Sequence, residues 1–526
     1  MKNRALQLLQ QTAQYLSEQR QQAYLVGGSL RNILLGEPCA DWDIAVHGDA
    51  ALLARRLADT LGGYYARMHE KASRVVIPAA PEGDDEVILD IAPFKGQSLE
   101  DDLRLRDFTV NAIAAPLDAI MRYIELGGFG FDTAKSRSYQ RGALLPLIDP
   151  TRGVADILAR RLRAVDSDVF QRDPLRLLRA VRLAARYQLE IESGTEGLMV
   201  RDALLLPEVA PERIHDELYA ILAPDGAARQ LRFLDTHGLL TALIPEFIPA
   251  RGMPQPTPHY WDVLEHSIET VDRLEQLAHL LQEEPINIEQ SPWEIAGECG
   301  LRAIQQLVIE AEAQEVFQFA MLTAPRMKLA ALLHDIGKPV TFTTDENDNV
   351  HFYGHPQVGA PLAMQIMRRM KASALDSRLV QQVTDHHMRP GQLAQLEKVS
   401  PRAIRRYFVD LGPAGIAVAL FSLADHLATR GPQPLTASWQ RHVATVCLLL
   451  TQYIHHRERI LPPKLVSAEE LMHRYNLSPG PIIGRLLDTI AEAQTDGTVN
   501  SKSDVFWLVE EMLRQGPSHP LSFKEE

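Results

Sequence analysis

Two kinds of hydrophobic pattern follow one another along the chain. Up to about residue 165, short apolar runs typical of strands alternate with helical stretches; these runs are AYLVGG, DWDIAV, SRVVIP and EVILDIA. Beyond this point strand-like runs almost disappear, and from DPLRLLRAVRLAARY onward the apolar positions repeat with the period of a helix. The pattern predicts an α+β protein that is mostly helical, with a small mixed sheet near the N-terminus.

Loop-forming sequences divide the helical part. LAPDGAA, RGMPQPTP and RGPQPLTAS combine proline, glycine and small polar residues, which favour turns. We therefore expect an α/β head over residues 1–165, a helical neck over 166–250, a helical domain over 251–430 and a helical tail over 431–526. A chain of 526 residues is long enough for these domains at about 100–200 residues each.

Charge and cysteine content restrict the function classes. A formal net charge of −14 argues against indiscriminate binding of nucleic acid, so any such contact has to use local basic patches. The three cysteines, Cys39, Cys299 and Cys447, are far apart and lack metal-ligand spacing, which favours a reducing cytoplasm. No signal-peptide core and no run of about 18 apolar residues is present, so we expect a cytoplasmic protein without membrane contact.

The run YLVGGSLRNILLGEPCADWDIAV has the composition of a site for a nucleoside triphosphate and its metals. A strand is expected to end on Gly27 and Gly28, which permit close approach of phosphate oxygens, and a helix to open with Arg31. On the next strand Asp41 and Asp43 are two residues apart and face the same way, so both can bind Mg²⁺. Taken alone, D-x-D also occurs in ordinary turns and solvated strand ends.

The following motifs resemble a known family. VILDIAPF followed by SLEDDLRLRDFTVNAIAAPL is similar to the head of class II tRNA nucleotidyltransferases and bacterial poly(A) polymerases, which include the CCA-adding enzymes. The resemblance implies that Asp90 is a third metal-binding acid. It also implies that Arg106, Asp107 and Asn111 hold the ribose and triphosphate; if their segment is a helix, Asp107 and Asn111 lie one turn apart.

Downstream, RDPLRLLRAVRLAARY resembles the family segment that pairs with the incoming base. Asp173 and Arg176 match the base-reading positions. An arginine stripe on this helix opposes an apolar face, which indicates an anionic partner or a solvated basic face; it consists of Arg176, Arg179, Arg182 and Arg186. The resemblance implies that Arg179 and Arg182, with Gly28, Arg31 and Arg106, hold the triphosphate.

Some positions depart from the family pattern. Asn32, Lys95, Leu105 and Arg172 stand where Asp, Arg, Arg and Glu are usual. The link from Phe94 to Arg106 is short, which resembles members that add only the two cytidines. Addition of CC alone therefore stays open beside addition of CCA.

A second set of motifs has the order of an HD-domain phosphohydrolase. PHYWDVLEHSI, ALLHDIGKP, YGHP, TDHHMRPG and SLADHLATR supply histidines and carboxylates that can close around a divalent ion. The expected ligands of the first ion are His266, His334, Asp335 and Asp425, and those of a second ion are His355 and His386. The metal is a transition metal or Mg²⁺, and the implied substrate is a phosphate monoester or a 2′,3′-cyclic phosphate at a damaged tRNA end.

The C-terminal run LSPGPIIGRLL resembles a family segment that grips the tRNA elbow, and Gly484 in it is expected to permit close helix approach. The whole chain predicts a template-independent enzyme that adds CCA, or only CC, to the 3′ end of tRNA from CTP and ATP with Mg²⁺. Three alternatives remain. They are a poly(A) polymerase, an HD phosphohydrolase with a degenerate head, and a non-catalytic RNA-binding protein.

Overall fold

The computed structural model describes residues 3–37, 39, 41–68, 72–79, 85–125, 145–295 and 299–515. The chain divides into two compact units. Unit 1 comprises Met1–Glu217 and Phe233–Leu243, and unit 2 comprises Leu218–Arg232 and Ile244–Glu526. The expected division into four domains stays a prediction.

Unit 1 is built on a six-stranded mixed sheet with the order β3-β4-β5-β2-β1-β6. Only the β2–β5 pair is parallel; the other pairs are antiparallel. The strands are β1 (Ala23–Val26), β2 (Asp41–Val46), β3 (Tyr64–Arg67), β4 (Ser73–Ile77), β5 (Val87–Pro93) and β6 (Ala114–Pro116). In β4 and β5 buried positions alternate with partly exposed ones, which places one face of each of these two strands in the core.

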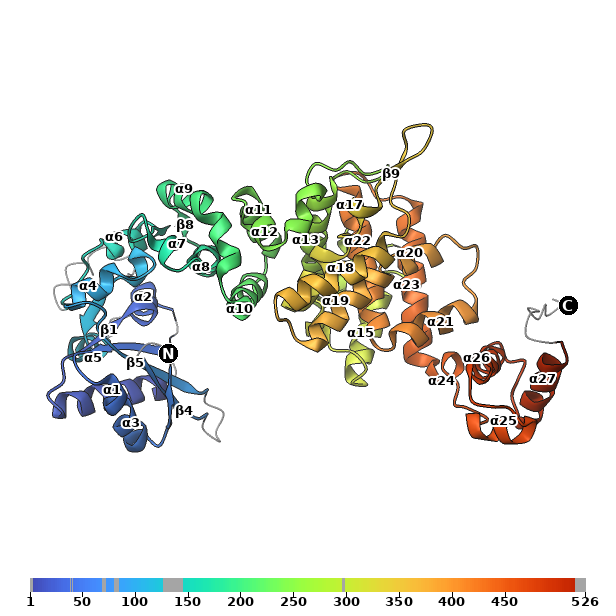
Figure 1. Cartoon of the computed structure of the whole chain (residues 1–526), viewed down its shortest axis with the longest axis horizontal. Coiled ribbons are helices and arrows are strands. Elements are labelled where there is room, and N and C mark those ends of the chain that lie inside the picture. Colours follow the sequence, from blue (N-terminus) through green and yellow to red (C-terminus); the bar gives the residue numbers. More distant parts are fainter. Residues whose placement is uncertain are drawn as a thin grey trace. The chain divides into compact units, whose positions relative to one another are not determined.

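Helices lie on both sides of this sheet (Figure 1). On one side are α1 (Asn3–Glu18), α3 (Ala50–Leu61) and α5 (Leu117–Glu125), and α1 contacts the other two. On the other side are α2 (Gly27–Leu35), α4 (Leu99–Arg104), the 3₁₀ turn η2 (Thr109–Asn111) and α6 (Gly153–Leu158). The carboxylates and the glycine turn belong to this second side.

The rest of unit 1 is helical. It contains α7 (Val169–Arg172), α8 (Arg176–Tyr187), α9 (Ser193–Asp202), η4 (Ala203–Glu208) and α12 (Leu239–Leu243), with β7 (Arg161–Leu162) and β8 (Glu190–Ile191) as a short parallel pair. The helices α10 (Pro211–Leu222) and α11 (Ala227–Thr236) each contribute residues to both units.

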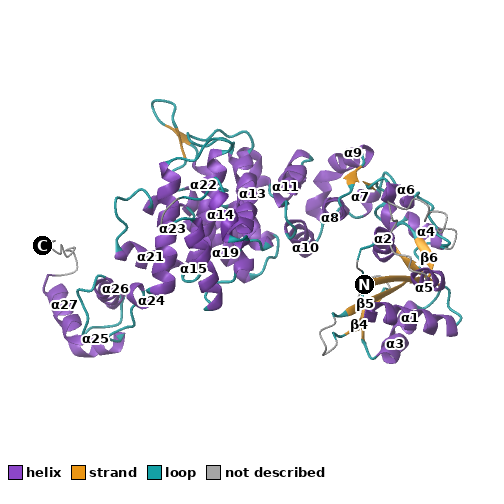
Figure 2. Ribbon diagram, turned by 180° about the vertical axis from the view of Figure 1, so that it is seen from behind, coloured by secondary structure: helices purple, strands orange, loops and turns teal. Residues whose placement is uncertain are grey.

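Unit 2 is almost entirely helical, as Figure 2 shows by the colours of its elements. Its first part contains η5 (Pro245–Ala250), α13 (Val263–Gln282), α14 (Pro285–Gln290), α15 (Leu301–Ala313), η6 (Phe319–Met321), α16 (Pro325–Leu333), α17 (Lys338–Thr341), β9 (Thr343–Thr344), β10 (Val350–His351) and α18 (His355–Arg369). Its second part contains α19 (Ala374–His386), α20 (Met388–Leu393), α21 (Pro401–Leu411), α22 (Ala414–Arg430), α23 (Ala437–His455) and α24 (Arg457–Ile460). The central helix α22 is buried along most of its length because its sequence is apolar on all sides.

The C-terminal helices α25 (Ala468–Tyr475), α26 (Pro481–Thr495) and α27 (Lys502–Gln515) form a separate small core. Two ion pairs connect α21 to the C-terminal end of α26: Arg402 pairs with Asp496, and Arg406 pairs with Glu492. The expectation that Gly484 permits close helix approach is wrong for the described residues, because a Cβ at Gly484 would have no neighbour within 4 Å.

The prediction of a mostly helical α+β protein is confirmed, and all described strands beyond residue 165 have only two residues. Within the described ranges no single helix is long and apolar enough to cross a membrane. α21 and α22 reach that length and composition only together, across a bend of 106°.

Candidate functional site

A glycine turn opens the site in unit 1. β1 ends at Val26 and α2 begins at Gly27, four residues before the expected start at Arg31. Gly27 has a φ of +67°, and a Cβ there would lie 2.6 Å from Nη1 of Arg106 and 3.2 Å from Oδ2 of Asp43. A side chain is therefore strained and crowded at this position, and glycine keeps the start of α2 open toward the carboxylates.

The predicted carboxylates lie on neighbouring strands. Asp41 and Asp43 occupy alternate positions of β2, and Asp90 of β5 is directly opposite Asp43 in the parallel register. Burial raises the pKa of Asp41 and of Asp43, and the charge of Asp90 raises both further. A cation between them would relieve this repulsion, so the three acids suit the two-metal site that the sequence predicts.

Asp90 has an additional partner. Arg74 of β4 binds it through two hydrogen bonds of 2.8 Å, from Nε to Oδ1 and from Nη2 to Oδ2. Asp90 therefore lies beside Asp43, as predicted, but both of its carboxylate oxygens accept hydrogen bonds from Arg74.

The segment after α4 contains a short 3₁₀ turn and no α-helix, but it brings the expected residues together. Asn111, in the 3₁₀ turn η2, donates from Nδ2 to Oδ1 of Asp107 at 2.9 Å. Arg31 is buried between Asn111, which accepts a bond from its Nη1, and the hydroxyl of Tyr187, which is 2.7 Å from its Nη2. Because it is held by protein groups, Arg31 joins α2 to η2 and α8.

The arginine stripe of α8 also has protein partners. Nε of Arg179 lies 2.9 Å from Oδ2 of Asp107, and Nε of Arg182 lies 2.5 Å from Glu217. Burial raises the pKa of Asp107, but the charge of Arg179, a hydrogen bond from Asn111 and one from its neighbouring backbone N–H outweigh burial and leave the pKa lowered. Arg179 is thus held in place by a buried, ionised carboxylate.

A cavity of about 320 Å³ lies beside these groups. From the predicted residues it is lined by Gly27, Gly28, Asp43, Arg106, Asp107, Asn111, Asp173, Arg176 and Arg179. Asp41, Asp90, Arg31 and Arg182 are not among the lining residues. Asp102, which sequence reasoning missed, also lines it and accepts bonds from Arg106 at 3.0 and 3.2 Å; its place four residues before Arg106 was the available signal.

Unit 2 contains a buried cluster of histidines and carboxylates. His266 comes from α13, His334 and Asp335 follow α16, and Asp425 comes from α22. Nε2 of His266 lies 3.0 Å from Oδ1 of Asp425, and Nε2 of His334 lies 3.1 Å from Oδ2 of Asp335. His355, the first residue of α18, approaches the other oxygen of Asp335 at 3.2 Å. Segments far apart in the sequence thus converge on one point.

The second histidine of the HH pair, not the first, belongs to the cluster. Nε2 of His387 lies 3.3 Å from Nε2 of His355 and 3.6 Å from Asp335, whereas His386 lies near Asp385 at 3.7 Å. Adjacent helical residues point about 100° apart, so only one of the two can face the cluster. The choice of His386 is therefore corrected to His387.

The histidine rings are oriented for a cation. The Nδ1 atoms of His334, His355 and His387 each contact the backbone carbonyl three residues earlier, at 2.8–2.9 Å, which directs each Nε2 into the cluster. Nε2 of His266, Nε2 of His334 and both oxygens of Asp335 are buried and make no hydrogen bond of regular geometry; their close neighbours are other members of the cluster and Lys338. Buried polar atoms in this state are costly unless an ion satisfies them, so the donor set fits one or two divalent metals.

The electrostatics agree with this interpretation. Burial lowers the pKa of His334, but the carboxylates of Asp335 and Asp425 outweigh it and raise the pKa to about 10, so a metal ion that binds this ring has to displace its proton. Burial lowers the pKa of His387 to about 3, so that ring is neutral and can act as a ligand. The two buried carboxylates therefore attract positive charge into this cluster.

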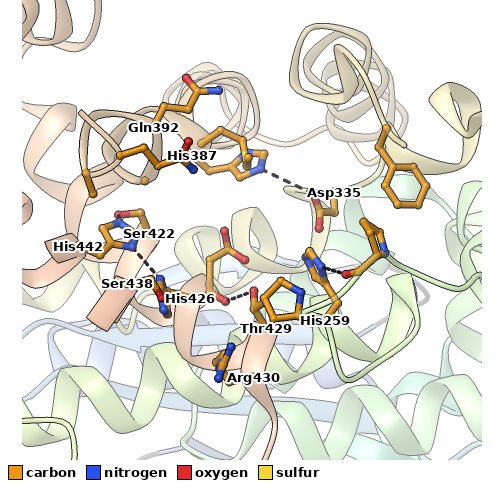
Figure 3. Close-up of a pocket in the computed structure, with 18 of the residues that line it drawn as sticks. His259, Asp335, His387, Gln392, Ser422, His426, Thr429, Arg430, Ser438 and His442 are labelled. Atoms are coloured by element: carbon orange, nitrogen blue, oxygen red, sulfur yellow. Dashed lines mark hydrogen bonds and ion pairs between the residues drawn. The ribbon is translucent and has the colours of Figure 1, made fainter. Parts of the chain in front are cut away.

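A cavity of about 420 Å³ opens onto the cluster. Nζ of Lys338 reaches Oδ2 of Asp335 at 2.5 Å at its wall. On the side away from Asp335, Figure 3 shows His442 close to Ser422 and His426. Ser422 and His442 are 2.9 Å apart, and the Nδ1 atoms of His442 and His426 are 3.0 Å apart. The sequence analysis did not single out His426 or His442.

Three family models match the chain. The poly A polymerase head domain matches residues 23–163, the probable RNA and SrmB-binding site of polymerase A matches 188–251, and the HD domain matches 313–430. Among solved structures, a CCA-adding enzyme with ATP has a TM-score of 0.59 at 18% identity, covering 99% of this chain and 97% of that chain. A Thermotoga maritima CCA-adding enzyme complexed with tRNA has a TM-score of 0.52 at 19% identity, covering 98% and 96%. These likenesses concern the fold.

Relatives match over nearly the whole length. An A-adding tRNA nucleotidyltransferase of Deinococcus radiodurans is 31% identical over 94% of this chain and 96% of its own. A CC-adding tRNA nucleotidyltransferase of Thermus thermophilus is 30% identical over 95% and 97%. The chain therefore belongs to the tRNA nucleotidyltransferase family that carries the poly A polymerase head domain.

Proposed function

We propose that this protein extends the 3′ end of tRNA by nucleotidyl transfer from ATP, CTP or both, without a nucleic-acid template. The observation that carries the proposal is the alignment of Asp41, Asp43 and Asp90 on one side of the sheet, beside a cavity lined by the glycine turn and by arginines of α8. Carboxylates at such spacing can bind two Mg²⁺ ions that activate the attacking hydroxyl and stabilise the leaving pyrophosphate.

The roles of the remaining residues follow from the cavity. Arg106 and Arg179 lie on its wall and are held by acids, so they can meet the triphosphate. Asp173 and Arg176 also line it, as base reading requires. In the structure Asp173 pairs with Arg213 at 2.9 Å, so reading a base would require an exchange of partners.

Three specificities for the added nucleotides are consistent with family membership. The short link from Phe94 to Arg106 favours addition of CC, full CCA addition is the general expectation, and the relative from Deinococcus radiodurans is A-adding. Addition of A alone was not among the specificities that we inferred from the sequence. The decisive measurement incubates the protein and Mg²⁺ with tRNA transcripts ending in the discriminator base, in C or in CC, with CTP and ATP separately and together.

Each specificity gives a different product. Growth by CC that stops with ATP present identifies a CC-adding enzyme, growth to CCA a full one, and growth only of the transcript ending in CC an A-adding one. Repeated addition of A to any RNA identifies a poly(A) polymerase. If no transcript is extended, the proposal is wrong.

We further propose that unit 2 is a metal-dependent phosphohydrolase. Its support is the buried cluster with unsatisfied ligand atoms that opens onto a cavity. The histidine-rich donor set favours a transition metal. Phosphate release from phosphomonoesters and cyclic phosphates is measured with Mg²⁺, Mn²⁺, Co²⁺ or Ni²⁺ and after chelation.

Two variants separate the activities. Asp41→Ala should abolish nucleotide addition and leave phosphate release, and Asp335→Ala should do the reverse. Loss of both activities in a folded single variant would contradict the model of two independent sites. We place the protein in the cytoplasm, which the free thiols of Cys39, Cys299 and Cys447 support.

A further inference from the structure

The cavity of unit 2 is larger than its metal cluster needs. A phosphoryl group bound by a metal ion in the cluster would occupy only part of 420 Å³, which is within the range of pockets for whole small molecules. The remaining wall includes aromatic side chains on one segment, Phe352 and Tyr353, and cations from other helices, Arg430 and Arg441. The cavity thus has a metal cluster suited to phosphate on one side and, on the rest of its wall, flat aromatic surface and positive charge.

Tyr353 provides an accessible aromatic face. Its side chain is 75% exposed although it lines the cavity. Its ring stacks on His351 with centroids 4.9 Å apart and an interplanar angle of 14°. One face of Tyr353 is therefore covered by an imidazole, and the exposed fraction leaves the other face accessible to a planar ligand.

This aromatic platform is held in place before any ligand binds. Nε2 of His351 lies 3.1 Å from Oδ2 of Asp345, and Oδ1 of the same carboxylate accepts hydrogen bonds from two backbone N–H groups in the turn of the β9–β10 hairpin. The neighbouring Phe352 contacts Phe342 at 6.0 Å between ring centroids. A ligand that stacks on Tyr353 consequently orders little additional chain.

The platform is connected directly to the metal cluster. The carbonyl of Phe352 contacts Nδ1 of His355 at 2.9 Å, and Tyr353 precedes His355 by two residues. Two residues span at most about 7 Å of backbone, so the platform and the cluster lie close enough for one small ligand to contact both. Gly354, with a φ of +71°, makes the turn between them.

From these contacts we propose that Tyr353, stacked on His351, is the nucleobase subsite of the unit 2 phosphohydrolase, with the phosphate at the metal cluster. This rests on the proposed hydrolase function and adds the part of the ligand that the cluster does not recognise. Base stacking on an aromatic side chain tolerates different bases, so the ligand class is a nucleoside phosphate, either free or at an RNA 3′ end.

The test compares two phosphomonoesters of secondary alcohols: adenosine 2′-monophosphate, which carries a nucleobase on a ribose ring, and glycerol 2-phosphate, which has neither. In the full-length protein with added metal, Tyr353→Ala should lower kcat/KM for the nucleotide about 10-fold, mainly through KM, and leave glycerol 2-phosphate within about twofold. Tyr353→Phe should retain wild-type values. Tyr64→Ala, which removes a tyrosine 70% exposed on unit 1, is the matched control and should change neither substrate.

Other outcomes overturn the subsite. Equal losses on both esters would show a structural effect on the cluster, and no loss on the nucleotide would show that the platform is unused. If the wild-type protein hydrolyses neither ester with any metal, the hydrolase proposal itself fails. Calorimetric binding of adenosine 2′-monophosphate to the wild type and to Tyr353→Ala then decides the subsite separately, since equal affinities contradict it.

A last arm identifies the source of the nucleotide. The same measurements are made on a short oligoribonucleotide that ends in a 2′-phosphate, with Arg441→Ala as an additional variant. A loss from Arg441→Ala on the oligonucleotide alone indicates an RNA end, because only RNA has an upstream phosphate for this cation. Equal losses on both indicate a free nucleotide, and either result is compatible with stacking on Tyr353.

Discussion

Gly337 is the position where a single methyl group should disable the metal centre of unit 2. It follows His334 and Asp335 by three and two residues and packs against the first turns of α18, which begins with His355. A Cβ at Gly337 would lie 2.2 Å from the carbonyl oxygen of His355 and 2.7 Å from the backbone nitrogen of Gly359. These are backbone atoms, so no side-chain rotation can relieve the contact.

The size of the effect follows from these distances. An ordinary contact of a Cβ begins at 3.4 Å, so α18 has to move by about 1 Å in Gly337→Ala. Metal–ligand distances tolerate about 0.2 Å, and a shift of this size therefore removes His355 from the ligand set. Overpacking of this kind costs about 1–3 kcal/mol, or roughly 2–12 °C in Tm for a unit of this size.

The assay measures binding of Mn²⁺ or Ni²⁺ by calorimetry, phosphate release, and Tm by circular dichroism. We expect at least about 10-fold weaker metal binding, as for loss of a group that orients a ligand, with nucleotide addition retained. Gly484→Ala is the control, because a Cβ there meets nothing within 4 Å. Wild-type metal affinity and phosphate release in Gly337→Ala would refute the reasoning.

Three further predictions concern other buried or paired charges. Arg74→Ala should lower the Mg²⁺ concentration that half-activates nucleotide addition about 2- to 5-fold, because Arg74 competes with the metal for Asp90; an unchanged value would argue against Asp90 as a ligand. Lys328 is buried against Glu275 at 2.6 Å, so Lys328→Met should cost about 3–5 kcal/mol in thermal unfolding, and a cost below about 1 kcal/mol would contradict the pairing. The pKa of Asp107 is lowered in the folded protein, so its ionised carboxylate stabilises the fold above a pH of about 4, and this stabilisation is lost as the pH falls. The free energy of unfolding of Asp107→Asn, measured in urea, should therefore depend less on pH between about 5 and 3 than that of the wild type. Parallel pH profiles would contradict this.

Much of the site in unit 1 could be predicted because it depends on short-range rules. Asp41 and Asp43 share a face by the two-residue repeat of a strand. Asp90 was implied by the family resemblance, and its place opposite Asp43 depends on the pairing of β2 with β5, which β3 and β4 separate in the chain. The contact of Asp107 with Asn111 was expected, but through a helix; the structure achieves it with a 3₁₀ turn instead. The spacing of four residues predicted that Asp107 and Asn111 lie together, but it did not predict the backbone conformation between them.

Other features depend on tertiary contacts that a linear pattern does not contain. The choice between His386 and His387 is set by the helical phase of α19 relative to α18, which the dipeptide HH does not reveal. The same holds for Arg31, which the sequence assigns to phosphates and the structure places between Asn111 and Tyr187.

The partners of the arginines change how the acidic composition is understood. A net charge of −14 opposes phosphate at long range, yet acids in unit 1 lie beside arginines that line its cavity: Asp102 beside Arg106, and Asp107 beside Arg179. An arginine held by a carboxylate loses little rotamer freedom when phosphate arrives, because its guanidinium has five donors and the pair uses only some of them. If Arg106 and Arg179 bind the triphosphate as proposed, these acids reduce the entropic cost of binding it, at the expense of some Coulombic attraction. For an enzyme that has to release pyrophosphate in each cycle, oriented but partly neutralised arginines favour turnover over tight retention.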